Sequence, residues 1–312
     1  MELHVWGTPS EISLLSPQSI AIYWYMSLCV PSELYEVVTS CNTDLSLSGQ
    51  LPTLICHGEG TQYDGLLDIL RYLDQQGFSL DTGLLKEQRA INEGLVLYVE
   101  DKFQLITDYC LFLNKSNYEQ YTRSLYSKYL PFPMQYNAPI VARSRAKLNC
   151  ERIGLKVEDK SQVTEEMMKN VPSVSKIHRM KYESMIEDKL LMKNSVTNMS
   201  CLRQLNEYVG RVLELQAELN ANHEGDTLGL FGENRLTSGD LIILAHIYVW
   251  TRAALPDQFI KTFLDKSYPH ISTQLEHLLQ ERINPATDHV QIRLPSFTES
   301  PNLFNSIKHL VI

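Results

Sequence analysis

Strand-type sequence is confined to the first quarter of the chain, and this segregation constrains the fold more than any other feature. Short apolar runs predict four strands, at residues 3–6 (LHVW), 35–40 (YEVVTS), 52–56 (PTLIC) and 61–63 (TQY). After Asp81 the strand signal nearly disappears. We therefore predict an α/β domain over residues 1–80, followed by an all-helical domain over residues 81–284.

Two helices are expected among the predicted strands. The first covers residues 16–29, where Ser16 supplies the cap and a proline follows at the first helical position. It is apolar nearly all round, as a helix buried between two layers would be. The second covers residues 64–76, with Asp64 as the N-cap and Gly77 as the stop.

The helical domain is predicted to hold helices separated by proline-rich or polar segments. They are expected at residues 84–113, 117–130, 138–153, 164–193, 200–222, 238–254, 256–266 and 270–282. Breaks are expected at LPFPM (130–134) and NAP (137–139). The Lys/Glu-rich residues 155–190 indicate a solvated helical connection. Residues 285–312 form a tail with a short amphipathic helix at 301–312, either a strap on the body or a membrane or partner contact.

Composition excludes several classes of protein. Hydrophobic residues at 44% and charged residues at 21% indicate a globular chain with a real core. The formal charge of −9 argues against a nucleic-acid partner. The six cysteines include no CxxC pair, so neither a disulfide framework nor a metal site is predicted. The most apolar stretch, residues 241–250, is about half the ~20 residues of a membrane helix, so no transmembrane helix is expected; its His246 should be hydrogen-bonded in the core.

Pro52 stands at the entrance of an apolar run, in QLPTLICH (50–57). Proline has no N–H to donate to a β ladder, so its place in a strand has positional meaning. Either Leu51-Pro52 is an ordinary turn before the strand, or the proline keeps a backbone position unpaired where something docks. In the second case we expect a cis peptide bond.

Three segments together resemble glutathione transferases: LPTLI (51–55), DILRYL (68–73) and LFGENRLTSGDLIILAHIYV (230–249). In the third segment, Thr237 and Asp240 have the spacing of a capping box, which fixes the start of a helix whose interior is wholly apolar. The resemblance implies a thioredoxin-like N-terminal domain joined to a C-terminal all-helical domain, with Pro52 heading the third strand.

The residues required for transferase chemistry are only partly present. A hydroxyl or thiol after the first strand would have to stabilise a thiolate, and four hydroxyls lie there: Thr8, Ser10, Ser13 and Ser16. The place that should bind the γ-glutamyl carboxylate of glutathione holds Leu66, which cannot do so, beside Asp64, which would repel it. Cys56 and His57 point to opposite faces of a strand. We therefore predict no catalytic residue and no cofactor, with a glutathione-dependent transferase or peroxidase as the alternative.

Residues 106–151 give a narrower resemblance. The segments TDY-LFLN (107–114), NYEQYT (117–122), FPMQYN-P (132–139), RS-A (143–146) and NCE (149–151) are similar to the metaxin family, in particular to the larger of the two peripheral subunits of the fungal mitochondrial sorting and assembly machinery. VWG (5–7) and NTDLS-G-LP (42–52) extend the resemblance, which fades through the Lys/Glu-rich connection and returns near residue 230.

The metaxin resemblance implies a non-enzymatic adaptor on the cytosolic face of the mitochondrial outer membrane. Such a subunit is peripheral and supports the insertion, maturation and release of β-barrel precursors, its transient partners. Its stable partners are a barrel insertase and a smaller metaxin-like subunit, and it couples to the general entry translocase through an acidic receptor.

The same central segment supplies the candidate partner-binding residues. Tyrosines are enriched at protein interfaces, and six of them cluster here, at positions 109, 118, 121, 126, 129 and 136. They either contact a partner or fill the space between the two domains. A local basic stretch is either a solvated face or a contact for an acidic receptor. The residues predicted for partner binding are Tyr118, Tyr121, Arg123, Lys128, Arg143, Arg145 and Lys147.

Overall fold

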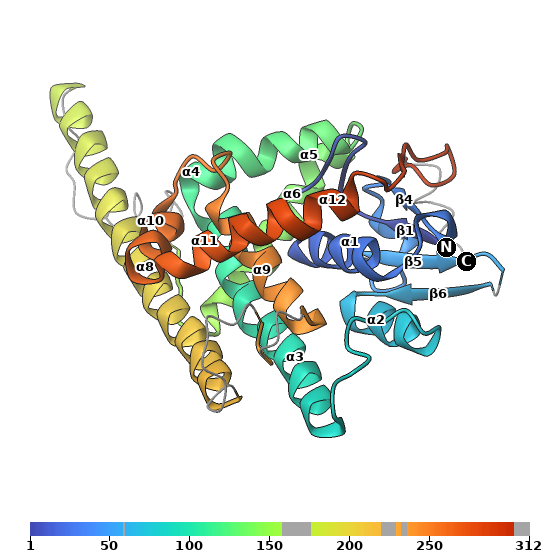
Figure 1. The fold of residues 1–312 in the computed structure, drawn as a ribbon. Coiled ribbons are helices and arrows are strands. Elements are labelled where there is room, and N and C mark those ends of the chain that lie inside the picture. Colours follow the sequence, from blue (N-terminus) through green and yellow to red (C-terminus); the bar gives the residue numbers. More distant parts are fainter. Residues whose placement is uncertain (59, 158–175, 220–228, 232–235, 303–312) are drawn as a thin grey trace.

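A five-stranded sheet forms one side of the molecule and a group of helices the other (Figure 1). The computed structural model describes residues 1–58, 60–157, 176–219, 229–231 and 236–302. The sheet has the order β6-β5-β1-β4-β7. Its strands are β1 (Glu2–His4), β4 (Glu36–Val38), β5 (Thr53–Cys56), β6 (Thr61–Asp64) and β7 (Ile292–Arg293).

The strand directions identify the sheet as thioredoxin-like. Strand β1 runs parallel to β4 and antiparallel to β5, and β6 is antiparallel to β5. All four predicted strands are confirmed, each to within a few residues. A small hairpin, β2 (Gly7–Thr8) with β3 (Glu11–Ile12), follows β1 and was not predicted. With the helices described next, the chain has the predicted glutathione-transferase fold.

Helix α1 (Pro17–Cys29) lies between the sheet and the helical part, where it packs against α2 (Leu66–Gln75) and α9 (Ser238–Thr251). Its start is as predicted: Ser16 is the N-cap, and its hydroxyl accepts a hydrogen bond from the Ser19 N–H at 3.1 Å. Because α1 meets neighbours on both sides, most of its side chains are buried, which explains its lack of a polar face.

The other helices form the second layer around α9. They are α3 (Lys86–Asp108), α4 (Lys115–Asn117), α5 (Arg123–Tyr129), α6 (Met134–Glu151), α8 (Lys176–Leu219), α10 (Phe259–Ser267), α11 (Pro269–Leu278) and α12 (Asn284–Thr287). Single π-helical turns continue α3 over Tyr109–Leu113 and α11 over Leu279–Ile283. Helix α9 packs against α1 and α3 and is almost wholly buried.

The predicted capping box at the start of α9 is confirmed. The Thr237 hydroxyl accepts from the Asp240 N–H, and the Asp240 carboxylate accepts from the Thr237 N–H at 2.9 Å. The same carboxylate also accepts from the Leu230 N–H at 3.0 Å. His246 lies fully buried in this helix, 2.8 Å from the Thr107 hydroxyl, as expected.

Two helix starts differ from the prediction. Asp64 ends β6 rather than capping α2, whose N-cap is Gly65 with φ +79°. Helix α6 begins at Met134, so the break expected at NAP (137–139) is absent and Pro139 lies inside the helix.

The two helices predicted at 164–193 and 200–222 are one continuous helix from Lys176 to Leu219. The polar residues 194–200 suggested an interruption. Instead, their hydroxyls bond back to carbonyls one turn earlier, Ser195 to Leu191 and Ser200 to Val196, which keeps them inside a helix. Residues 158–175, most of the expected Lys/Glu-rich connection, lie outside the described residues.

Residues 285–302 of the predicted tail pack on the body of the molecule. They contain β7, which pairs in parallel with β4 and adds a fifth strand to the sheet. Strand β7 has only two residues, Ile292 and Arg293, and these show no strand-type pattern, so the sequence could not reveal this pairing. The amphipathic helix predicted at 301–312 falls on residues that the structure does not describe beyond Asn302. In the part of the chain that the structure describes, no helix combines the length and apolarity needed to span a membrane.

Candidate functional site

A polar cleft of about 330 Å³ lies where the sheet half meets the helical half. Its sheet side carries Ser16, Gln18 and Leu51, and its helical side carries Glu100 and Gln104. The two sides touch directly, because the Gln18 amide donates to the Gln104 side-chain oxygen at 2.8 Å. This is the place where a transferase of this fold would hold its thiol substrate.

The residue before the proline at the head of β5, Leu51, belongs to the wall of this cleft. Leu51-Pro52 is a cis peptide bond, as the second of the two sequence-based alternatives predicted. The carbonyl of Leu51 accepts from the Ser16 hydroxyl at 3.4 Å, and the carbonyl of Pro52 accepts from the Gly65 N–H at 3.0 Å. The strand entrance is therefore tied to the starts of both α1 and α2.

Of the four hydroxyls considered for catalysis, Ser16 lines the cleft. Thr8 and Ser10 hydrogen-bond to each other in the β2–β3 hairpin, and the Ser13 oxygen accepts from the Leu15 N–H. Ser16 caps α1 with the same oxygen that would have to face a thiolate. The hydroxyl is therefore present in the right region but already engaged by the backbone.

The position expected to bind a carboxylate is closed. Leu66 is only 2% exposed, so it presents no surface to a ligand. Asp64 accepts hydrogen bonds from the Thr53 hydroxyl at 2.6 Å, the Leu47 N–H at 2.7 Å and the Gln62 amide at 3.0 Å. Burial acts to raise the pKa of Asp64, but these hydrogen bonds outweigh it and lower the pKa overall. A fixed negative charge thus stands where glutathione would place its own.

The helical wall of the cleft is acidic as well. Burial raises the pKa of Glu100 to about 7. Burial also raises the pKa of Asp108, against the opposing effect of hydrogen bonds from Gln104 and Asn149 and of the nearby Arg145. Two carboxyl groups therefore face one guanidinium across this cavity. An anionic peptide such as glutathione gains little from such a lining.

Aromatic side chains fill the space beside the cleft. Trp6, which follows β1, lies 5.7 Å from the Tyr126 ring and 6.2 Å from the Tyr129 ring, so it joins the sheet half to α5. Tyr109 and Tyr126 are buried. For Tyr126 and Tyr129, filling the space between the two halves is the alternative that the structure supports. Tyr109 instead packs inside the helical half, with its ring against Phe259 and its hydroxyl bonded to Asn198.

The predicted partner-binding residues do not form a single surface. Tyr118 is 5% exposed and Tyr121 is half-buried. The Arg143 guanidinium lies 4.5 Å above the Tyr118 ring. Arg145 lines the cleft close to Asp108, and Lys147 is half-buried on α6.

The remaining two basic residues are open to solvent. Arg123 and Lys128 lie exposed at the two ends of α5. A partner would reach both without any rearrangement of this chain; Arg145 is exposed as well but lies at the cleft close to Asp108.

An exposed apolar face on α6 was missed by the sequence reading. We call it the α6 row; its members are Phe132, Tyr136, Ile140, Val141 and Leu148, all more than half exposed. Four of them belong to α6, where spacings of four and seven residues relate Tyr136 to Ile140 and Val141 to Leu148. Phe132 precedes the helix, with its ring centroid 6.1 Å from that of Tyr136. The pattern is visible in the sequence, but we attributed this segment's importance to its tyrosines and charges.

Helix α8 carries a second exposed apolar row. Met185, Met192 and Met199 recur every seven residues and are exposed, with Val196 between them. Unbranched methionine side chains adapt to different neighbours and are common at binding surfaces. Their seven-residue period was the signal that could have revealed this row.

Comparison with known proteins gives matches over both halves. Residues 19–143 match the family described as outer mitochondrial membrane transport complex protein, Tom37, and residues 156–312 match the Tom37 C-terminal domain. A metaxin-1 homolog of Drosophila melanogaster is 31% identical over 104 residues, 33% of this chain and 31% of that protein. Metaxin-3 of Xenopus laevis is 24% identical over 139 residues, 45% of this chain and 44% of that protein.

The matched segments therefore span less than half the length of these curated relatives. Among solved structures, a glutathione S-transferase of Ceriporiopsis subvermispora in complex with glutathione is 14% identical, with a TM-score of 0.49. That comparison covers 89% of this chain and 96% of the transferase.

Proposed function

The chain belongs to the Tom37 family of outer mitochondrial membrane transport complex proteins, and from this we propose that it is a non-enzymatic adaptor of the sorting and assembly machinery in that membrane. In this role it supports the insertion, maturation and release of β-barrel precursors. It acts as a peripheral subunit on the cytosolic face and stabilises a late assembly state by binding that state better than earlier ones.

The observation that carries the adaptor role is the α6 row. Five large apolar side chains of one short segment, residues 132–148, stand in solvent, each more than half exposed. Contiguous exposed apolar side chains on a globular protein mark a site of protein or membrane contact. We assign this face to the stable neighbours of the subunit, the barrel insertase and the smaller metaxin-like subunit.

The cleft supports the non-enzymatic half of the proposal. Leu66 is buried where a carboxylate would have to bind, Asp64 is held in its ionised form beside it, and Ser16 is engaged in capping. Each of these opposes glutathione binding for a different reason. Together they favour a scaffold that keeps the transferase fold without its reaction.

Coupling to the general entry translocase is assigned to the exposed basic residues of α5. Arg123 and Lys128 are exposed in a chain with a net charge of −9, so they offer a local attraction to an acidic receptor. Electrostatic contacts of this kind act mainly on the rate of association and weaken with salt.

Co-purification from detergent-solubilised mitochondria tests the adaptor role. The variant Ile140→Gln with Leu148→Gln removes two apolar members of the α6 row without changing charge. We expect less barrel insertase and less smaller subunit to co-purify with it. The matched control is Leu85→Gln with Leu97→Gln on α3, because these leucines are 66% and 51% exposed, against 60% and 66% for the test pair.

Equal recovery of both partners with the test and control variants would reject the assignment of this face. If the unmodified chain recovers neither partner, the adaptor role itself is wrong. Circular dichroism and thermal unfolding of each variant establish that the fold is retained, so that a loss of partners is not a loss of structure.

A further inference from the structure

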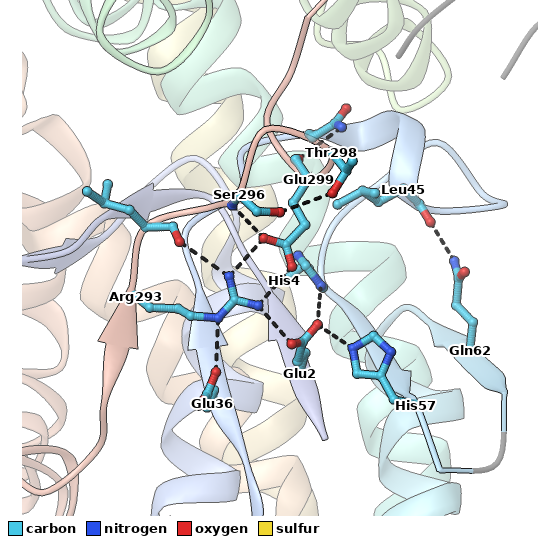
Figure 2. A network of polar contacts seen from close by, with 12 residues as sticks. Glu2, His4, Glu36, Leu45, His57, Gln62, Arg293, Ser296, Thr298 and Glu299 are labelled. Carbon is cyan, nitrogen blue, oxygen red and sulfur yellow. Dashed lines mark hydrogen bonds and ion pairs between the residues drawn. The ribbon is translucent and has the colours of Figure 1, made fainter. Parts of the chain in front are cut away.

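A group of ionisable side chains gathers on the sheet face opposite the apolar core (Figure 2). Glu2 and His4 are two residues apart on β1, so they share a face, while Leu3 between them is buried in the core. The C-terminal segment 294–302 crosses this face and brings Glu299 to them. His57, just beyond β5, approaches from the other side, with its Nε2 2.6 Å from a Glu2 oxygen.

His4 is the unusual member of this group. Its side chain is 0% exposed, and neither ring nitrogen has a hydrogen-bond partner. The nearest acceptor, Oε2 of Glu2, lies 3.7 Å from Nε2, beyond hydrogen-bond distance. A buried imidazole with an open nitrogen facing carboxylates calls for a ligand, because buried polar atoms are nearly always satisfied.

The carboxylates near His4 outnumber the one cation that binds them, Arg293. The Arg293 guanidinium bonds to Glu2 at 2.8 Å, to Glu36 at 2.9 Å and to both oxygens of Glu299 at 2.8 Å. Three carboxylates share one guanidinium, which leaves net negative charge beside the open histidine nitrogen.

We propose that Glu2, His4 and Glu299 bind a zinc ion, with His57 as the fourth ligand. One donor atom from each of the first three lies within 4.8 Å of the others. Two atoms bound to the same tetrahedral zinc lie about 3.3–3.6 Å apart, given bonds of about 2.0–2.2 Å. The glutamate side chains and His57 must therefore turn toward His4 when the ion binds.

The donor set favours zinc over the other common divalent ions. Calcium and magnesium take oxygen ligands, whereas imidazole nitrogen suits zinc, and two imidazoles with two carboxylates give the four ligands of a tetrahedral site. Arg293 does not compete with the ion for every position, because a carboxylate has about four lone-pair directions. Glu2 bonds to Arg293 through one oxygen and to His57 through the other.

The site would fasten the C-terminal segment to the first strand. Three of its ligands come from residues 2–57, and the fourth, Glu299, lies near the opposite end of the chain. This separation explains why no metal-binding spacing is visible in the sequence. The site is independent of the proposed adaptor role, and its test does not involve the import machinery.

Titration of the full-length chain with Co²⁺, which takes zinc's tetrahedral sites and absorbs visible light, tests the proposal, followed by displacement with Zn²⁺. We expect one equivalent of Co²⁺ to bind. His4→Gln and Glu2→Gln should each weaken binding more than about 100-fold, because even partners outside the coordination shell are worth about 10–100-fold. Glu2→Gln decides the question if His4→Gln does not fold.

His277→Gln is the matched control for His57→Gln, because His277 is also exposed and also paired with a glutamate, Glu281 at 2.9 Å. The control should bind Co²⁺ normally and His57→Gln should not. Hydrogen exchange gives the location: zinc should slow the amides of residues 294–302 in the unmodified chain. Failure of the unmodified chain to bind Co²⁺, or unchanged binding by His4→Gln and Glu2→Gln, would overturn the proposal.

Discussion

Trp6 lies edge-on against Tyr126, with ring centroids 5.7 Å apart. Trp6 leaves the first strand of the sheet, and Tyr126 belongs to α5, so this pair is a direct link between the two halves of the molecule. The pair lies beside the cleft, so it holds the two halves together at the place where a transferase would admit its substrate.

Replacing Trp6 by alanine should therefore destabilise the protein by about 2–3 kcal/mol, through lost aromatic packing and the space left behind. Chemical denaturation measures this loss. Trp6→Phe, which keeps a ring against Tyr126, is the control and should cost clearly less. An unchanged midpoint for Trp6→Ala would mean that the two halves are held together elsewhere.

The start of α9 offers a second test of stability. Thr237→Ala removes the hydroxyl that accepts from the Asp240 N–H and should lower the free energy of unfolding by about 1–2 kcal/mol. Thr237→Ser retains the hydroxyl and should lose much less. If the two variants are equally stable, the capping box does not hold this buried helix start.

Acid should weaken the fold through His246. Burial lowers the pKa of His246 to about 3. Below the ordinary histidine pKa of about 6.5, this side chain takes up a proton in the unfolded chain but not in the native protein. The contribution of His246 is therefore fully present above pH 6.5 and is lost as the pH falls toward 3.

The free energy of unfolding falls by about 1.4 kcal/mol per pH unit below pH 6.5, or by about 2 kcal/mol at pH 5. His246→Gln removes the titrating group while retaining an acceptor for Thr107. The difference in unfolding free energy between pH 7 and pH 5 should therefore be about 2 kcal/mol smaller in this variant. An identical pH dependence in both proteins would contradict the prediction.

Glutathione chemistry should be absent. The unmodified chain should pass through immobilised glutathione without retention, because Leu66 and Asp64 close the carboxylate position. Thiol-conjugation rates should not exceed the uncatalysed background, and Ser16→Ala should leave them unchanged. Saturable turnover that disappears in Ser16→Ala would establish the transferase alternative and reject the non-enzymatic role.

Charge reversal on α5 should weaken association with the entry translocase. Arg123→Glu with Lys128→Glu changes two exposed residues, whereas Arg143 and Arg145 are poorer choices because they contact Tyr118 and face Asp108. The control, Lys86→Glu with Lys266→Glu, makes the same change of charge on α3 and α10.

The difference in translocase recovery between the α5 double variant and this control should shrink as salt increases, because exposed charges are screened. Co-purification at two ionic strengths measures it. Equal losses for test and control variants would show that only total charge matters.

Local signals predicted much of this fold. The cap at Ser16, the capping box of Thr237 with Asp240 and the strand headed by Pro52 each depend on residues close together in sequence. Such features can be read without knowing the rest of the chain, which is why their positions are confirmed almost residue by residue.

Features that depend on distant neighbours could not be predicted in this way. Tyr118 is buried because α6 covers it, and Arg145 faces the cleft because of the rotation of α6 about its axis. His4 looks like an ordinary strand residue until Glu299 is brought beside it. The burial of a side chain, the direction in which it points and its pairing with a residue far along the chain are properties of the folded protein. The candidate site depends on all three.

Strand β7 has a consequence for the order of events during synthesis. Strand β4 emerges from the ribosome early, but its parallel neighbour lies at residues 292–293. At about 5–20 residues per second, the edge of β4 stays unpaired for on the order of tens of seconds. During that time the nascent chain carries an open sheet edge, which is a template for wrong pairing and a reason for a chaperone to stay bound until translation ends.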